Sequence, residues 1–160
     1  MPKRVPEKTA AQNMTVLIEN QQSKHPISIE RVQKTAQVIL SALDSPEGEL
    51  SILIVDDIGI AQLNETYLQR KGPTNVIAFP MREGLHADIN PHLIGDVVIS
   101  MDTCAREAQN AEIPIDQRFN QLLIHGILHL FGYDHIHSSE EEHIMESKSE
   151  ELLALIETIE

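Results

Sequence analysis

Apolar residues along this chain follow two patterns, short continuous runs and longer stretches in which they recur every three or four positions. The runs are rich in Val, Ile and Leu, which is typical of buried β-strands. They predict strands at 14–20, 50–55, 75–80 and 93–100. The stretches with helical spacing predict helices at 29–43, 58–68, 102–111 and 117–130, and a last helix from residue 139 onward.

Residues that can cap free backbone N–H groups mark the starts of these helices. Ser28 precedes the first predicted helix, and Asp56 precedes the second. Asp116 is predicted to cap the fourth helix. Ser139 followed by Glu142 has the spacing of a capping box, and it predicts the start of the last helix.

The predicted order of elements is β-α-β-α-β-β-α-α-α. This order is typical of an α/β (α+β) domain, here with a mixed sheet of about four strands packed with about five helices. A chain of 160 residues is long enough for one hydrophobic core. We therefore expect a single domain over 1–160, with a flexible N-terminal segment at 1–13. Residues 81–92 contain Gly, Pro, Asn and two His, and they are expected to form an exposed loop.

The composition of the chain indicates the cellular compartment of the protein but says little about any reaction that it catalyses. Cys104 is the only cysteine, which excludes an internal disulfide and fits a reducing compartment. Neither a secretory signal nor a run of about 18 apolar residues is visible, so we expect a cytoplasmic protein. The net charge of −13 disfavours a polyanionic partner, but residues 138–160 alone hold eight Glu and one Lys. This concentration at one end leaves room for a positive cleft elsewhere.

The strongest chemical signal is the segment HGILHLFGYDH at 125–135. His125 and His129 are four residues apart on a predicted helix, so both imidazoles project from the same face. Gly132 can end the helix in the left-handed conformation, after which the chain turns and brings His135 near the pair. Three imidazoles that leave one position open for water are the ligand set of a catalytic zinc ion. We therefore predict one Zn²⁺ held by His125, His129 and His135 on a zincin-like central helix.

The remaining histidines carry weaker signals. Two His four residues apart also occur by chance in helices, and it is the added glycine and third histidine that favour the metal site. His25, His86, His92 and His143 are expected to be exposed polar residues. His137 is closer to the predicted site and harder to set aside.

The spacing H-x-x-x-H-x-x-G-x-x-H is that of the metzincin proteases, with one difference. Those enzymes carry the general-base Glu directly after the first His, where this chain has Gly126. Without that carboxylate the peptidase mechanism lacks its proton acceptor. Peptide hydrolysis therefore becomes the second choice, and the general base of the reaction is unassigned.

Several segments share their order and spacing with one known family. They are VDD at 55–57, LNETY and PTNVIAFP within 63–80, IGDVVIS at 94–100, and HGILHLFGYDH itself. Together they resemble the YbeY family, bacterial zinc-dependent endoribonucleases whose signature is H-G-x-L-H-L-x-G-Y-D-H. The resemblance covers roughly residues 14–160, and the final signature is its most specific part.

The resemblance implies a single-strand-specific endoribonuclease that acts in rRNA maturation, at the 3′ end of 16S rRNA, and in ribosome quality control. It implies RNA and the ribosome or ribosomal proteins as partners, without DNA or a membrane. RNA binding is not visible from the residues alone. The chain has no basic stripe, and its three Phe and two Tyr are too few for a stacking platform.

The resemblance also implies roles for single residues. Family members often carry Arg directly after the aromatic residue of L-N-x-x-Y, where this chain has Leu68. Arg70, two residues later, is predicted to contact phosphate instead, with Lys71 as a weaker second. His129 is expected to act in catalysis through a metal-activated water. Asp134 is expected either to orient an imidazole as a hydrogen-bond acceptor or to stabilise its own turn.

Some assignments stay open at the level of sequence. Thr74, Asn75 and Ser100 could bind substrate, although buried roles at strand ends would explain them as well. A metalloprotease-like peptide hydrolase is one other class of function, and it needs a carboxylate near the zinc from outside the motif. A non-catalytic ribosome-associated factor, whose metal only stiffens the turn, is another.

Overall fold

The computed structural model describes residues 15–81, 92–134 and 138–160. Along them the chain forms β1 (Val16–Asn20), α1 (Ile29–Ala42), β2 (Glu49–Val55), α2 (Asp57–Leu68), β3 (Val76–Pro80), β4 (Leu93–Ser100), α3 (Met101–Ala111), α4 (Ile115–Leu130) and α5 (Ser139–Glu157). The predicted order of strands and helices is confirmed within these residues. The N-terminal segment 1–13 and most of the predicted loop at 81–92 lie outside them.

The described strands form one mixed sheet with the order β1-β2-β4-β3. β1 and β4 pair with β2 in parallel, whereas β3 runs antiparallel to β4 at the edge. Because β2 and β4 are parallel and in register, they end side by side at Val55 and Ser100. The helices α2 and α3 start from these two strand ends, so their first turns meet at one edge of the sheet.

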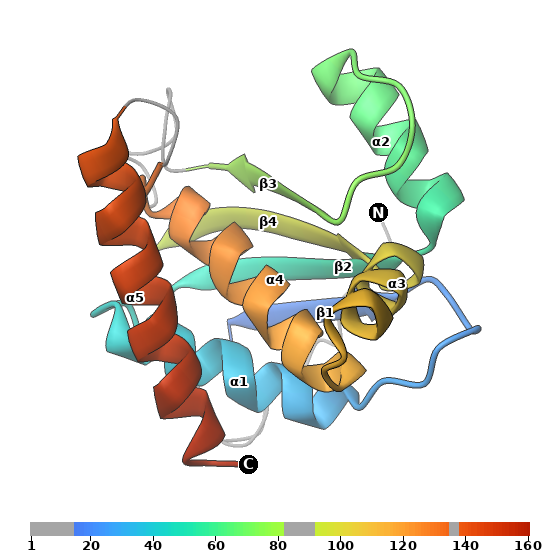
Figure 1. Ribbon diagram of the computed structural model, residues 1–160. Coiled ribbons are helices and arrows are strands. Elements are labelled where there is room, and N and C mark those ends of the chain that lie inside the picture. The colour runs from blue at the N-terminus through green and yellow to red at the C-terminus, as the bar shows by residue number, and fades with distance from the viewer. Residues whose placement is uncertain (1–14, 82–91, 135–137) are drawn as a thin grey trace, which may run out of the picture.

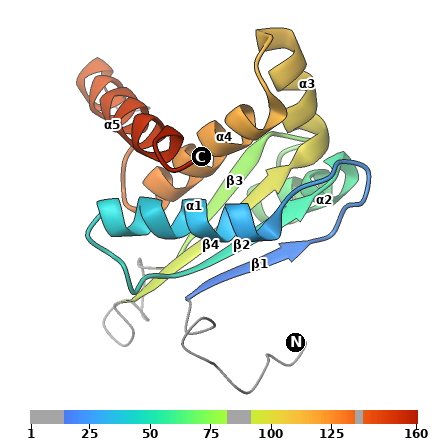
Figure 2. The same cartoon turned by 90° about the horizontal axis from the view of Figure 1, so that it is seen from below.

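Helices cover both faces of the sheet (Figures 1 and 2). α1 and α4 lie on one face with α5 packed along them, and α2 lies on the other. Side chains alternate accordingly along β4. Val97 and Ile99 belong to the large core beneath α1 and α4, whereas Val98 packs in a small cluster with Ile60 of α2. The side chains of α2 and those of α4 therefore lie on opposite faces of the sheet.

The caps predicted for α1 and α2 are confirmed, and that of α5 is shifted by one residue. Ser28 and Asp56 each accept a hydrogen bond from the backbone N–H three residues on. In α5 it is Ser138, not Ser139, whose hydroxyl accepts from the backbone N–H of Glu141, at 3.0 Å. The run SSEEE contains two overlapping capping boxes, and the helix uses the first.

Asp116 does not cap α4, contrary to the prediction. The helix begins at Ile115 directly after Pro114, which has φ −60° and makes no side-chain cap bond. Proline suits a helix start because it has no N–H to satisfy and its φ is already helical. Asp116 lies in the first turn, where a carboxylate interacts favourably with the positive end of the helix dipole. It also pairs with Arg31 of α1 at 3.1 Å.

Cys104 is a core residue of α3. It is fully buried, and burial raises the pKa of its thiol to about 12. The thiol therefore stays protonated and unreactive at neutral pH. As for membranes, the described part of the chain contains no helix that is both long and apolar enough to cross one.

Candidate metal centre

The imidazoles of His125 and His129 face each other on α4. Their Nε2 atoms are 3.0 Å apart, and their ring centroids are 4.5 Å apart with the planes at 79°. Both residues are half-buried, on a helix whose neighbouring positions are packed in the core. The prediction that the two histidines share one face of a helix is confirmed.

This arrangement fits two ligands of one zinc ion. Zinc binds imidazole nitrogen at about 2.0–2.1 Å with tetrahedral geometry, which places two ligand nitrogens about 3.3 Å apart. The observed 3.0 Å differs by only a small ring rotation. His135 lies outside the described residues, and among those that are described no three His, Cys, Asp or Glu side chains form a group that could hold a metal. The third ligand and the zinc therefore stay predictions.

The turn after α4 reverses the chain immediately beyond the histidine pair. Gly132 has φ +92°, and its N–H donates to the His129 carbonyl at 3.0 Å. The N–H of Tyr133 donates to the carbonyl of Leu128, also at 3.0 Å. These two bonds form a Schellman motif, the common left-handed ending of a helix. The predicted role of Gly132 is confirmed, and the approach of His135 to the pair requires such a reversal.

Gly126 explains why the general base of the metzincins has no place in this fold. It is buried where α4 crosses the sheet, and a Cβ there would lie 2.8 Å from Cγ1 of Val97 and 3.2 Å from Cγ2 of Val76. Consecutive helix residues point about 100° apart, so the residue after His125 faces the sheet rather than the site. A glutamate at this position would be buried among apolar side chains.

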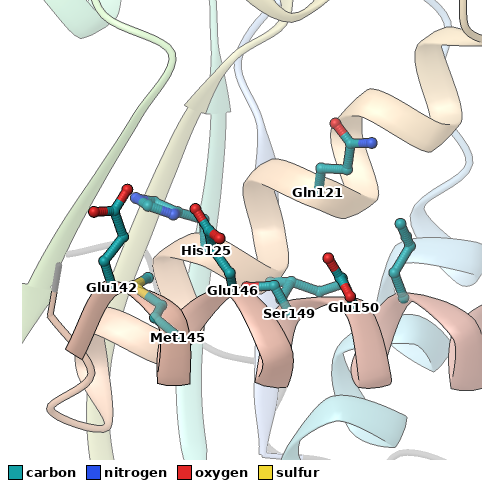
Figure 3. Close-up of a pocket in the computed structure, with 9 residues that line it drawn as sticks. Gln121, His125, Glu142, Met145, Glu146, Ser149 and Glu150 are labelled. Atoms are coloured by element: carbon teal, nitrogen blue, oxygen red, sulfur yellow. The ribbon is translucent and has the colours of Figure 1, made fainter. Parts of the chain in front are cut away.

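A pocket of about 370 Å³ opens between α4 and α5 beside His125. Figure 3 shows the Glu142 and Glu146 side chains rising from α5 on the same side as the His125 ring. The full lining is Gln121, Ile124, His125, Glu142, Met145, Glu146, Ser149, Glu150 and Leu153. One wall of the candidate site is therefore acidic.

The sequence interpretation missed these glutamates as site residues. The charge of residues 138–160 was considered only as a concentration of acid at one end of the chain, although Glu142, Glu146 and Glu150 recur every four residues and so share one face. That spacing was the available signal. What it could not reveal is that this face turns toward α4, because the packing of two helices depends on the whole core rather than on local pattern.

Asp134 follows the turn at the end of α4. It is half-buried and lines a second pocket of about 520 Å³ with Phe131, Gly132, Tyr133, Glu141 and Ile144. Its neighbour His135 is not among the described residues, so its predicted role in orienting an imidazole stays a prediction.

Arg70 and Lys71 follow the end of α2, on the opposite side of the sheet from α4. Both are exposed. The backbone N–H of Arg70 donates to the carbonyl of Asn64 at 3.2 Å, and no ion pair of Arg70 or Lys71 is present among the described residues. The fold thus leaves both cations open to a ligand but does not place them in contact with the histidine pair.

Of the three residues suggested as substrate ligands, two have partners within the fold. Asn75 donates to both carboxylate oxygens of Glu107 at 3.2 Å. Ser100 is fully buried; its hydroxyl caps α3 by accepting from Thr103 and donates to Asp57 at 2.7 Å. Thr74 is half-buried. The alternative of a buried strand-end role therefore describes Ser100 best.

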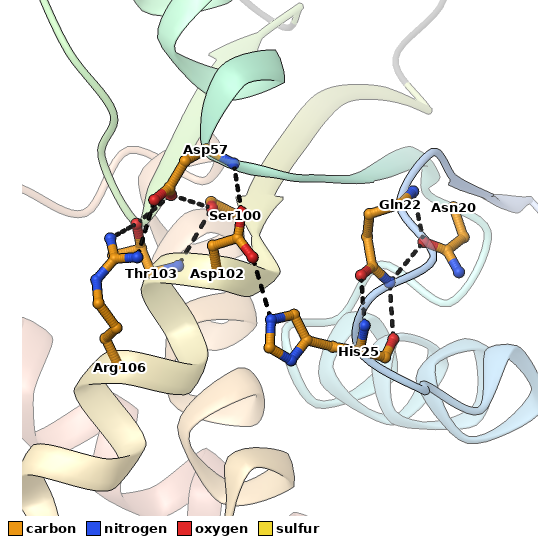
Figure 4. Close-up of polar contacts among 8 residues, drawn as sticks. All are labelled: Asn20, Gln22, His25, Asp57, Ser100, Asp102, Thr103 and Arg106. Atoms are coloured by element: carbon orange, nitrogen blue, oxygen red, sulfur yellow. Dashed lines mark hydrogen bonds and ion pairs between the residues drawn. The ribbon is translucent and has the colours of Figure 1, made fainter.

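Two aspartates join the first turns of α2 and α3 at the edge where β2 and β4 end (Figure 4). Asp57 accepts hydrogen bonds from Ser100 and Thr103 and pairs with Arg106 at 2.9 Å. Asp102 accepts from the backbone N–H of Asp57 at 3.0 Å and contacts His25 at 3.1 Å.

This network corrects one expectation and shifts two pKa values. His25 was expected to be exposed, but its side chain is only 20% exposed. The loop after β1 packs on α3, where His25 contacts Asp102. His92 and His143 are exposed as predicted. Burial raises the pKa of Asp57, but hydrogen bonds from Thr103, Ser100 and Arg106 outweigh it and lower the pKa below its ordinary value. The hydrogen bond from the backbone N–H of Asp57 lowers the pKa of Asp102 as well.

Asp57→Asn is expected to destabilise the protein in a pH-dependent way. A carboxylate whose pKa is lowered on folding stabilises the folded state above its unfolded pKa, and that contribution is lost as the pH falls through its folded pKa. The free energy of unfolding of the variant should therefore be about 1–3 kcal/mol lower than that of the wild type near pH 7. This difference should narrow as the pH falls below about 4. Urea unfolding between pH 3 and 7 measures it. Glu65→Gln, on the exposed surface of α2, is the control; equal losses would contradict the assignment.

The fold and the site together define a class, a single α+β domain with an H-x-x-x-H pair on its central helix beside an acidic pocket. Comparison with known families identifies the class further. The profile described as Endoribonuclease YbeY matches residues 17–157. The chain belongs to this family, which confirms the resemblance drawn from its motifs.

Individual relatives agree with the family. The chain is 50% identical over 140 residues to Endoribonuclease YbeY of Syntrophotalea carbinolica, covering 87% of this chain and 93% of that one. The protein of the same name from Geobacter sulfurreducens is 50% identical over 145 residues, covering 90% and 97%. The solution structure of TM1509 from Thermotoga maritima matches with a TM-score of 0.62 and 19% identity over 88% of both chains. At that identity it supports the fold alone.

Proposed function

We propose that this chain is a zinc-dependent endoribonuclease that cleaves single-stranded RNA. The observation that carries the proposal is its membership of the Endoribonuclease YbeY family over residues 17–157, a span that includes the histidine pair and the reversal after it. The convergence of the two Nε2 atoms at 3.0 Å supports a metal at this position. His135 completes the ligand set in the proposal.

Each part of the chain has a distinct task in this function. His125, His129 and His135 hold the ion, which when bound supplies a Lewis acid and an activated water. Arg70, with Lys71 beside it, binds the phosphate backbone through charge-assisted hydrogen bonds. Asp134 orients an imidazole. The carboxylates of Glu142 and Glu146 line the pocket of His125 and provide candidates for the general base that the sequence left unassigned.

The setting of the reaction also belongs to the proposal. The substrate is rRNA, cut during maturation of the 16S 3′ end, and the ribosome or its proteins are the partners. Quality control of ribosomes is a further role, and the cytoplasm is where these partners occur. Family membership supports this setting, and neither DNA nor a membrane takes part in it.

A cleavage assay separates this function from its alternatives. The zinc-loaded chain should cut a single-stranded RNA that carries a 16S 3′ end and leave duplex RNA, DNA and a casein substrate intact. Peptide cleavage must be included, because Glu142 and Glu146 provide the carboxylate outside the motif that a metalloprotease needs. Casein cleavage without RNA cleavage would overturn the proposal.

Arg70→Ala is expected to raise KM for single-stranded RNA by about 10- to 100-fold, because a charge-assisted hydrogen bond to phosphate is lost. In the variant, the slope of the logarithm of the RNA-binding constant against the logarithm of the salt concentration should decrease in magnitude by about one. Lys34→Ala removes an equal charge from the exposed surface of α1 and serves as control. A KM that changes equally in both variants would show that Arg70 acts only through net charge.

A further inference from the structure

One aromatic side chain stands out on the surface of the protein. All five aromatic residues lie among the described residues, and four are buried or half-buried. Tyr67, on the last turn of α2, is 61% exposed. An edge contact with Phe79 of β3 holds its ring, with the centroids 5.7 Å apart and the planes at 72°. A large apolar ring held this way and left open to solvent has the form of a stacking surface.

Positive charge accompanies this ring. Arg70 and Lys71 come three and four residues after it and are exposed. Other arginines of the described chain pair with carboxylates, namely Arg31, Arg106 and Arg118. Arg70 has no such partner among the described residues. Its guanidinium is thus available for an anion supplied by a ligand.

The turn that carries these cations is fixed to the helix. Asn64 is only 5% exposed, and its side-chain amide donates to the carbonyl of Gly72 at 3.0 Å. Its own carbonyl accepts from the N–H of Arg70 at 3.2 Å. Gln69 takes the left-handed conformation with φ 53° and ends the helix. The backbone that carries the ring and the two cations is therefore held in one conformation, which lowers the entropy cost of binding.

The charge distribution favours this side of the molecule for RNA. The wall of the His125 pocket on α5 contains Glu142, Glu146 and Glu150, and an acidic wall repels phosphate. The edge strand β3 has Phe79 on the α2 side, whereas Val76 packs near Gly126 of α4. Figure 1 shows α2 and α4 on either side of β3. An RNA strand bound across this edge would extend from the side of α2, with its cations, to the side of α4, with its histidines.

We propose that Tyr67 stacks on one base of the single-stranded RNA substrate, while Arg70 and Lys71 contact the phosphates next to that base. The inference rests on the proposed function and adds a base contact to it. One exposed ring suffices for one base, because stacking does not depend on base identity. Asn64 acts as the positioning residue for the turn.

Tyrosine fluorescence tests the stacking directly, because the chain has no Trp and only two Tyr. Titration with oligouridine should quench the emission of the zinc-loaded wild type and of Tyr133→Phe. It should leave the remaining emission of Tyr67→Phe unquenched. Quenching in Tyr67→Phe equal to that of the wild type would overturn the proposal.

Binding and cleavage provide the second measurement. Tyr67→Ala should bind oligouridine about tenfold more weakly and raise KM rather than lower kcat, whereas Tyr67→Phe should stay near the wild type. Ile58→Ala, which trims another exposed apolar side chain of α2, should bind like the wild type. Unchanged affinity in Tyr67→Ala would overturn the proposal. If the wild type still cleaves RNA, the proposed function survives that result. A wild type that neither binds nor cleaves RNA would overturn both the proposed function and the stacking.

Discussion

His129→Ala is expected to reduce cleavage of single-stranded RNA by about 10³-fold or more, on the scale of losing a group that stabilises the transition state. The two described imidazoles converge at 3.0 Å, so removing one leaves too few ligands for an ion at this position. The fold should persist, because His129 is only half-buried. The apolar positions of α4, including Leu123 and Ile127, stay in the core.

Three measurements on the same preparation check this expectation. They are zinc content by elemental analysis, cleavage rate, and unfolding midpoint in urea. His143→Ala is the matched control, because His143 is exposed on α5 and should affect none of them. Wild-type cleavage by a zinc-free His129→Ala would end the metal hypothesis. An unfolded variant would instead support a metal that only stiffens the turn.

The order of elements was predictable because it depends on local pattern. Runs of Val, Ile and Leu have the period and length of strands, and the caps Ser28 and Asp56 are local hydrogen bonds. The histidine pair belongs to the same category, since four residues on a helix bring two side chains to one face. Where two local solutions compete, as with Ser138 and Ser139, the sequence could not select one.

What the sequence could not provide was the relation between distant elements. Glu142 and Glu146 join the His125 pocket only because α5 packs against α4. Arg70 was expected to contact the phosphate of the substrate, but the sequence did not show that α2 lies across the sheet from α4. The salt bridge of Asp116 with Arg31 likewise connects α4 to α1. Each of these depends on packing of the complete core.

Gly126→Glu, which would restore the general base of the metzincins, is expected to prevent folding rather than to create a peptidase. The side chain would enter the space between α4 and the sheet, where even a Cβ would lie 2.8 Å from Val97. Burying an unpaired carboxylate among apolar side chains adds to that clash. A loss of about 4 kcal/mol or more places this variant among the most damaging single substitutions.

Gly126→Ala gives a graded version of the same test. Alanine gains about 1 kcal/mol of helix propensity over glycine, while overpacking costs about 1–3 kcal/mol, so a net loss is expected. Val97 is a buried strand residue with little freedom to move, which is why the clash outweighs the gain. The double variant Gly126→Ala/Val97→Ala should lose less free energy of unfolding than the sum of the losses of the two single variants, because the smaller residue at position 97 relieves the contact. Urea unfolding measures all four proteins. If Gly126→Ala proves more stable than the wild type, α4 does not pack this closely on the sheet, and the absence of the metzincin glutamate needs another cause.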